Sequence, residues 1–170
     1  MRLLAEEKKL GTMELLMTSP ITTVETILGK FFACLTLYAV IEVLGLTYLL
    51  LLGKYGNPDW GPILTAYISV LLMGAVFISV GMVASAITEN QIIAVVISLC
   101  TLLLFWLIDW AAASSGPLTA QIIRGISIIE HMRDSMRGLI DTKDVIFFLS
   151  FTVFGLFLTH RIVESQRWRG

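Results

Sequence analysis

Residues 63–113 read ILTAYISVLLMGAVFISVGMVASAITENQIIAVVISLCTLLLFWLIDWAAA, and their only charged side chains are Glu89 and Asp109. Crossing a hydrocarbon core of about 30 Å takes about 20 helical residues. Residues 63–86 and 92–113 are each long enough to do so. The short polar segment between them leaves room only for a tight turn, so the stretch predicts a transmembrane helical hairpin.

Two further apolar runs flank this hairpin. Residues 31–53 precede it, across a segment at 53–62 whose glycines and prolines forbid a continuing helix. Residues 143–160 follow it, and Asp141, as N-cap with Asp144 three residues on, lets that helix start early enough to reach the required length. We therefore expect an all-helical, polytopic membrane protein with about four transmembrane helices.

The composition agrees with a membrane protein and argues against a nucleic-acid partner. Of 170 residues, 56% are hydrophobic and 15% are charged, which is far from the balance of a soluble domain. The formal net charge is −1, so there is no global basic field to attract nucleic acid. We therefore expect the chain to lie in a lipid bilayer.

The chain lacks the motifs of an enzyme. Gly29-Lys30 and Gly53-Lys54 miss the earlier glycine and the following hydroxyl of a phosphate-binding loop, so ATP must be used elsewhere. No Gly-x-Ser-x-Gly or His-Glu-x-x-His pattern supports an intramembrane hydrolase. His131 and His160 stand apart from other ligand-type residues, so we expect no metal site.

Residues 118–140 combine apolar side chains at helical spacing with interspersed charges. This pattern predicts an amphipathic or re-entrant helix at the outer interface. Two interpretations stay open, a connector on the membrane surface and an element that gates a substrate path. The apolar positions are Ile122, Ile126, Ile129, Met136 and Ile140.

Basic residues indicate the orientation. With both termini cytoplasmic, seven Lys and Arg side chains lie inside and five outside. Four of those five lie in one segment that also carries four acidic residues, and without it the excess clearly favours both ends inside.

The N-terminal residues 1–30 are the least lipid-like part of the chain. Gly11 breaks a first helical stretch, Thr12 is placed to cap a short second one, and Ser19-Pro20 stops it. Thr22 and Glu25 then have the spacing of a capping box that opens the first span. The pattern predicts an elbow of short helices at the cytoplasmic surface of the membrane. Such an elbow, judged on these residues alone, is also compatible with a simple connector.

The string MRLLAEEKKLGTMELLMTSP at residues 1–20, followed by Gly29-Lys30-Phe31, resembles the cytoplasmic elbow of ABC-2 type transporter permeases. It is most similar to the gliding-motility-associated branch. Residues 56–62, 87–91 and the ending from Leu158 resemble the same branch, so the likeness covers essentially the whole chain.

The resemblance implies a permease subunit that dimerises, as a homodimer or a heterodimer, and works with a separate ATPase subunit in the cytoplasmic (inner) membrane, usually for export. ATP would be bound by that partner, so no cofactor is expected in this chain. The elbow would then be the coupling segment, and residues 31–170 the transmembrane domain. Its candidate contacts with the ATPase are Thr12, Glu14, Thr18 and Ser19, and Glu89 and Asn90 either form a second contact or cap the helix that follows.

One departure from the family pattern concerns length. Family members usually have six spans, two of them before the elbow, so we expect this chain to hold the last four, either as a fragment or as a reduced subunit. A function of another class, a non-transporting membrane anchor or assembly subunit of a cell-envelope complex, is the alternative.

Two acidic residues lie inside predicted spans. Glu42 is at the middle of the first span, where no Lys or Arg is available to pair with it. It either donates a hydrogen bond to another helix in its protonated form or takes part in substrate or proton coupling. Asp109, flanked by Trp106 and Trp110, is interpreted as an interfacial anchor. The small residues Ala75, Ser79, Gly81 and Ser85 predict close helix packing.

Overall fold

A computed structural model describes residues 5, 22–113, 125, 127–139 and 141–167, with the side chains of residues 109–113 and 167 outside the description. Every element in this described part is a helix, and four helices are long and apolar enough to cross a membrane. The all-helical class and the four spans are thus confirmed, and each predicted span lies inside a somewhat longer helix. The helices are α3 (Thr23–Tyr55), α4 (Trp60–Ile87), α5 (Gln91–Ala113), α7 (Ile128–Ser135) and α8 (Thr142–Arg167).

Short polar side chains start the helices where the sequence predicts. Thr22 and Glu25 form the capping box of α3: the N–H of Glu25 donates to Thr22 Oγ1 (3.3 Å) and the N–H of Thr22 donates to Glu25 Oε2 (2.8 Å). Before α8, the N–H of Lys143 donates to Asp141 Oδ1 (3.2 Å). At 1.5 Å per residue, the 33 residues of α3 measure about 50 Å, so this helix is longer than a hydrocarbon core is thick.

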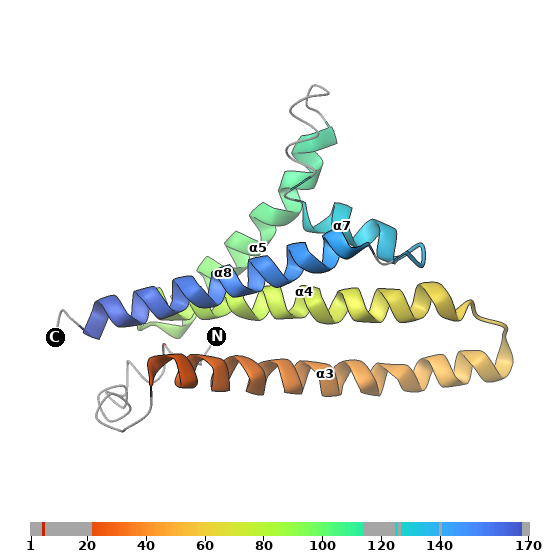
Figure 1. Ribbon diagram of the computed structural model, residues 1–170, viewed down its shortest axis with the longest axis horizontal. Coiled ribbons are helices and arrows are strands. Elements are labelled where there is room, and N and C mark those ends of the chain that lie inside the picture. The colour runs from red at the N-terminus through yellow and green to blue at the C-terminus, as the bar shows by residue number, and fades with distance from the viewer. Residues whose placement is uncertain (1–4, 6–21, 114–124, 126, 140, 168–170) are drawn as a thin grey trace.

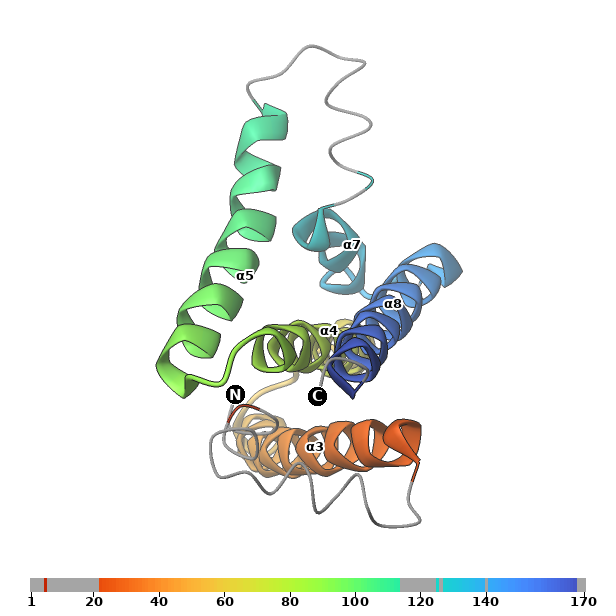
Figure 2. The same cartoon turned by 90° about the vertical axis from the view of Figure 1, so that its left-hand side faces the viewer.

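The central helix is α4. It contacts α3, α5, α7 and α8, and Figure 2 shows α3 on one side of it and the other three helices on the opposite side. Helices α3, α4 and α8 run side by side, whereas α5 diverges obliquely from them (Figure 1). Half of the most apolar window of α4 is buried, against none of the corresponding window of α3. Most of α3 therefore faces away from the rest of this chain.

Small side chains on α4 let its neighbours come close. The ring of Tyr38 on α3 lies over Gly74, where a Cβ atom would overlap it. On another face of α4, Ser79 lies against Gly155 of α8. Such close approach is the main source of helix association where lipid surrounds the helices. The predicted packing positions Ala75, Ser79, Gly81 and Ser85 are all buried.

The molecule has two distinct ends. The start of α3, the α4–α5 turn and the end of α8 lie together at one of them, called the turn end below (Figure 1). There Gln166 Nε2 donates to the carbonyl of Ala86 (3.2 Å), and the N–H of Ala5 donates to Ser85 Oγ (2.9 Å). The opposite, loop end holds residues 56–59, and the turn after α7 reaches it because Gly138 lies against Pro62.

The helix between α5 and α8 differs from its prediction. Its buried residues are Ile128, Met132 and Ser135, and Met136, which is 62% exposed, is its C-cap, so the described helix ends before the predicted one. The helix ends at Ser135, and Gly138, with a positive φ of 87°, lies in the turn that follows, so the apolar period of the sequence continues past the end of the helix. Ile122, Ile126 and Ile140 lie outside the described residues.

Candidate functional site

The α4–α5 turn is held by its own short polar side chains. The N–H of Asn90 donates to Thr88 Oγ1 (3.1 Å), and the N–H of Ile92 donates to Asn90 Oδ1 (2.9 Å). Asn90 therefore caps α5, one of the two roles that the sequence left open for it. Glu89 is exposed beside it, which leaves its carboxylate accessible from the turn end.

Segments far apart in the sequence meet around this turn. Ala5 is fully buried and bonds to Ser85 on the last turns of α4. Val163 of α8 packs against Ala86, and Gln166 bonds to the Ala86 carbonyl. The turn end thus joins a residue of the N-terminal segment, the end of α4 and the end of α8 in one place. Thr12, Glu14, Thr18 and Ser19 lie outside the described residues.

Glu42 lies on the side of α3 that faces α4. It lines a pocket of about 260 Å³ together with Gly45, Ala66, Tyr67 and Val70. Its Oε1 atom is buried and has no hydrogen-bond partner among the described residues. The expected hydrogen bond to another helix is therefore not formed by this oxygen within the described part of the chain. The other intramembrane acid, Asp109, lies in α5, and its side chain is outside the description.

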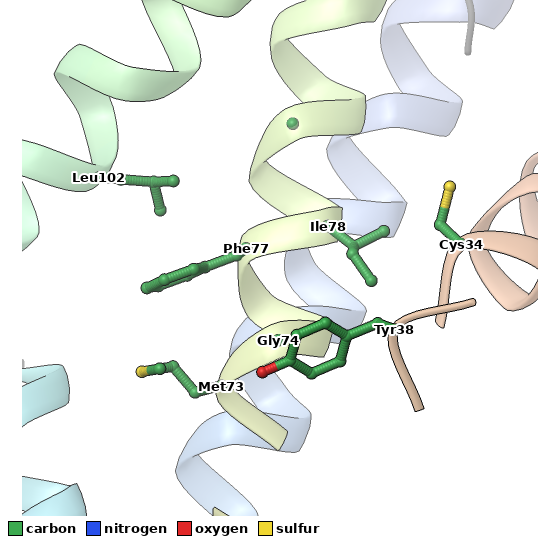
Figure 3. Close-up of a pocket in the computed structure, with 8 residues that line it drawn as sticks. Cys34, Tyr38, Met73, Gly74, Phe77, Ile78 and Leu102 are labelled. Carbon is green, nitrogen blue, oxygen red and sulfur yellow. The ribbon is translucent and has the colours of Figure 1, made fainter. Parts of the chain in front are cut away.

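An apolar pocket of about 310 Å³ lies between α3, α4 and α5. Figure 3 shows the ring of Tyr38 lying across α4 at Gly74, and Phe77 pointing from α4 towards Leu102 of α5. The Tyr38 hydroxyl donates to the carbonyl of Val70 (3.3 Å) and so is not free for chemistry. The pocket offers apolar contact surface rather than a catalytic group. Its lining residues are Cys34, Tyr38, Met73, Gly74, Phe77, Ile78, Gly81 and Leu102.

A buried polar layer joins α7 to α4. Thr65 Oγ1 donates to the carbonyl of Ser135 (2.6 Å), and Ser69 Oγ donates to Ser135 Oγ (2.6 Å). Ser69 and Ser135 are both at least 96% buried. Because water does not reach buried hydroxyls, each needs a partner inside the protein. These bonds hold the end of α7 against the first half of α4.

The same layer continues to α8 through His131. His131 Nδ1 lies 2.7 Å from Asp144 Oδ1, and its Nε2 lies 3.3 Å from the carbonyl oxygen of Gly125. The imidazole stacks on Phe147 with ring centroids 4.0 Å apart and planes inclined by 19°. Asp144 is 7% exposed, and its Oδ2 atom has no hydrogen-bond partner among the described residues.

This pair is not predicted from the sequence, which places His131 away from any cluster of ligand-type residues and Asp144 only at the start of α8. The turn after α7 brings the two residues together. One signal in the sequence is the four-residue spacing of His131 and Ser135. It puts two polar side chains on one face of a short helix and so indicates that this face makes polar contacts. Within the described residues no group of three or more metal-ligating side chains forms.

Charges near α7 are mostly neutralised locally. Arg133 lies 3.0 Å from Glu130, and Lys143 lies 3.4 Å from Asp141. The N–H of Lys143, which donates to the Asp141 carboxylate, holds the pKa of Asp141 below its usual range.

Comparison with known proteins gives one match. A family model described as ABC-2 family transporter protein matches residues 1–166 of the chain. No curated protein and no solved structure matches significantly. The family match covers all of the described helices except the last residue of α8.

Proposed function

We propose that this chain, which belongs to the ABC-2 family of transporter proteins, is a permease subunit that couples ATP hydrolysis by a separate ATPase subunit to export of a substrate. The observation that carries the proposal is the family match across residues 1–166. The four helices that are long and apolar enough to cross a membrane agree with a membrane-spanning role. Within that family, the proposal places the chain in the gliding-motility-associated branch, which its sequence resembles.

The ATPase subunit docks at the turn end in this proposal. Ala5 of the N-terminal segment lies against Ser85, next to the α4–α5 turn, so a protein bound to that segment would also reach the turn. Glu89 is an exposed carboxylate there. The contact candidates are Thr12, Glu14, Thr18, Ser19, Glu89 and Asn90, although the side-chain oxygen of Asn90 is already used in capping α5.

The turn end is then the cytoplasmic side of the inner membrane. Ala5 and Gln166 both lie at this end, as expected if both termini of the chain are on one side. The excess of basic residues in the terminal segments supports the same orientation.

A second permease subunit, identical or different, completes the proposed transporter. Helix α3 carries large apolar side chains that this chain leaves exposed, including Leu37, Ile41 and Leu44 at 60–65% exposure. In the bilayer such side chains face lipid or another helix. Glu42 lines a pocket at the α3–α4 boundary, and both roles considered for it, a structural one and one in substrate or proton coupling, stay open in this proposal.

The test is to purify the tagged chain from its native membrane with its bound proteins, reconstitute the complex in liposomes, and measure ATP hydrolysis. We expect an ATPase subunit to co-purify and hydrolyse ATP. Glu89→Lys, which reverses an exposed charge at the turn end, should reduce both recovery of that subunit and hydrolysis several-fold. Lys54→Glu, a charge reversal of an exposed residue at the loop end, is the matched control and should change neither.

Two outcomes would contradict the proposal. A stable complex with cell-envelope proteins and no ATPase subunit would favour the membrane anchor or assembly subunit. Equal loss of hydrolysis in Glu89→Lys and Lys54→Glu would show that the turn end is not the docking site.

A further inference from the structure

The carboxyl group of Glu42 lies near the middle of the membrane-spanning helix α3. Its Oε1 atom is buried and has no hydrogen-bond partner among the described residues. The basic residues of α3, Lys30 and Lys54, are each twelve residues away, which is about 18 Å along the helix. Helix α4, which α3 packs against, carries no charged residue. Because an unpaired carboxylate is costly at this depth, Glu42 needs a positive charge or a proton that neither helix supplies.

A pocket lies directly beside this carboxyl group. It has a volume of about 260 Å³, and Glu42 lines it together with residues of both α3 and α4. Glu42 as a whole is partly exposed, so a ligand can reach its side chain. Pockets for drug-sized ligands start at about 300 Å³. The space beside Glu42 therefore suits a smaller molecule.

The hydroxyl group of Tyr67 is a second polar group at this pocket. It lies close to the α3 backbone, because a Cβ atom at Gly45 would be 3.2 Å from it. Gly45 follows Glu42 by three residues, which places both on one face of α3. A phenol can accept a hydrogen bond as well as donate one. The pocket thus combines a carboxyl group and a hydroxyl group that can both serve as acceptors.

The rest of the lining decides which kind of cation would fit. Ala66 and Val70 offer apolar contacts to an organic body, and the ring of Tyr67 can attract a positive charge. A calcium or magnesium ion is a poorer fit, because such ions take about six or more oxygen ligands. Within the described residues no group of three metal-ligating side chains forms. A proton alone would neutralise Glu42 but would give the adjoining pocket no role.

We propose that Glu42 and Tyr67 form a binding site for a small organic ammonium ion at the α3–α4 boundary. The Glu42 carboxylate is the counter-ion, and the Tyr67 hydroxyl accepts a second N–H of the ligand. Tyr38, one turn before Glu42, holds the two helices together beside the site, because its hydroxyl donates to the Val70 carbonyl (3.3 Å). That the bound ion is of the substrate class that the transporter exports rests on the proposed function.

The test measures binding of para-fluorobenzylammonium to the purified full chain in lipid nanodiscs by fluorine NMR, with empty nanodiscs as the blank. We expect saturable binding above the blank. Glu42→Gln should weaken it about tenfold or more, the effect of losing one charge-assisted hydrogen bond. The neutral probe para-fluorobenzyl alcohol has nearly the same shape, and its affinity should be the same for the wild type and Glu42→Gln.

A second variant keeps the proposal testable if Glu42→Gln does not fold. Tyr67→Phe removes only the hydroxyl group and should weaken binding of the ammonium probe about threefold, as expected for one neutral hydrogen bond. The matched control is Tyr48→Phe, because Tyr48 also lies on α3 but is 76% exposed and does not line the pocket. This control should bind the ammonium probe as the wild type does.

Three results would overturn the proposal. Binding of the ammonium probe no stronger than to empty nanodiscs would show that Glu42 is satisfied by a proton alone. Equal affinity of the wild type and Glu42→Gln for the ammonium probe would exclude the carboxylate as the counter-ion. An equal loss for the alcohol probe would show that the substitution acts through the shape of the pocket. None of these measurements uses ATP or an ATPase subunit, so failure here is distinguishable from failure of the proposed function.

Discussion

Gly155 of α8 lies so close to Ser79 of α4 that a Cβ atom at position 155 would be 2.6 Å from Ser79 Oγ and 2.9 Å from Ser79 Cβ. The Ser79 hydroxyl donates to the carbonyl of Val76 (2.7 Å) and cannot turn aside without losing that bond. The α4–α8 contact thus depends on the absence of one side-chain atom.

Gly155→Ala should accordingly destabilise the fold. The added methyl group must push α8 away from α4, which costs about 1–3 kcal/mol for overpacking of a well-packed core. Unfolding in mixed micelles with increasing SDS measures the loss. The matched control is Gly29→Ala on α3, where a new Cβ meets nothing within 4 Å. That variant should be neutral or slightly stabilising, and equal losses in the two variants would contradict the packing argument.

The contact between Tyr38 and Gly74 allows a test of how α3 is held. Gly74→Ala should weaken α3–α4 packing by about 1–3 kcal/mol, because the new methyl group would overlap the Tyr38 ring. In a Tyr38→Ala background the same substitution should cost less than about 0.5 kcal/mol, since the ring is gone. SDS-induced unfolding of the four proteins of this cycle provides the measurement. Additive losses would indicate that the methyl group added at position 74 does not contact the Tyr38 ring.

Substitutions of Asn90 and Glu89 distinguish the structural role of the α4–α5 turn from its proposed role in coupling to the ATPase subunit. Asn90→Ala removes the cap of α5 and should lower stability by about 1 kcal/mol. Glu89→Ala removes an exposed carboxylate and should leave stability unchanged, while lowering the ATP hydrolysis of the reconstituted complex. Thermal unfolding and hydrolysis measured on both variants test this. A loss of stability in Glu89→Ala as large as in Asn90→Ala would mean that Glu89 is also structural.

Glu42→Gln tests the role of the intramembrane carboxyl. The amide keeps the shape of the side chain, so insertion and assembly should be preserved if the residue is structural. Membrane fractionation and size-exclusion chromatography check this expectation, and transport by reconstituted liposomes distinguishes the two roles left open for the residue. A rate near that of the wild type would support a structural role, whereas a complete loss of transport with intact assembly would assign Glu42 to substrate or proton coupling.

Much of the fold could be predicted because its signals are local. A capping box such as Thr22 and Glu25 lies within four residues, and the α4–α5 turn depends on neighbouring side chains at Thr88 and Asn90. The prediction of a helix over residues 118–140 extends too far at its C-terminal end, because an apolar period does not show that the helix ends at Ser135. The elbow residues Glu14 and Ser19 stay a prediction, since they lie outside the described residues.

The amino-acid sequence by itself determined the four spans, their helical nature and their caps, because a bilayer accepts only long apolar segments whose backbone groups are satisfied internally. Which faces of these helices pack against one another was decided only by the tertiary structure. Helices such as α4 are apolar nearly all round, so no stripe of side chains marks the face that Gly155 approaches. His131 and Asp144, which are thirteen residues apart, become partners only because the turn after α7 brings the start of α8 next to His131.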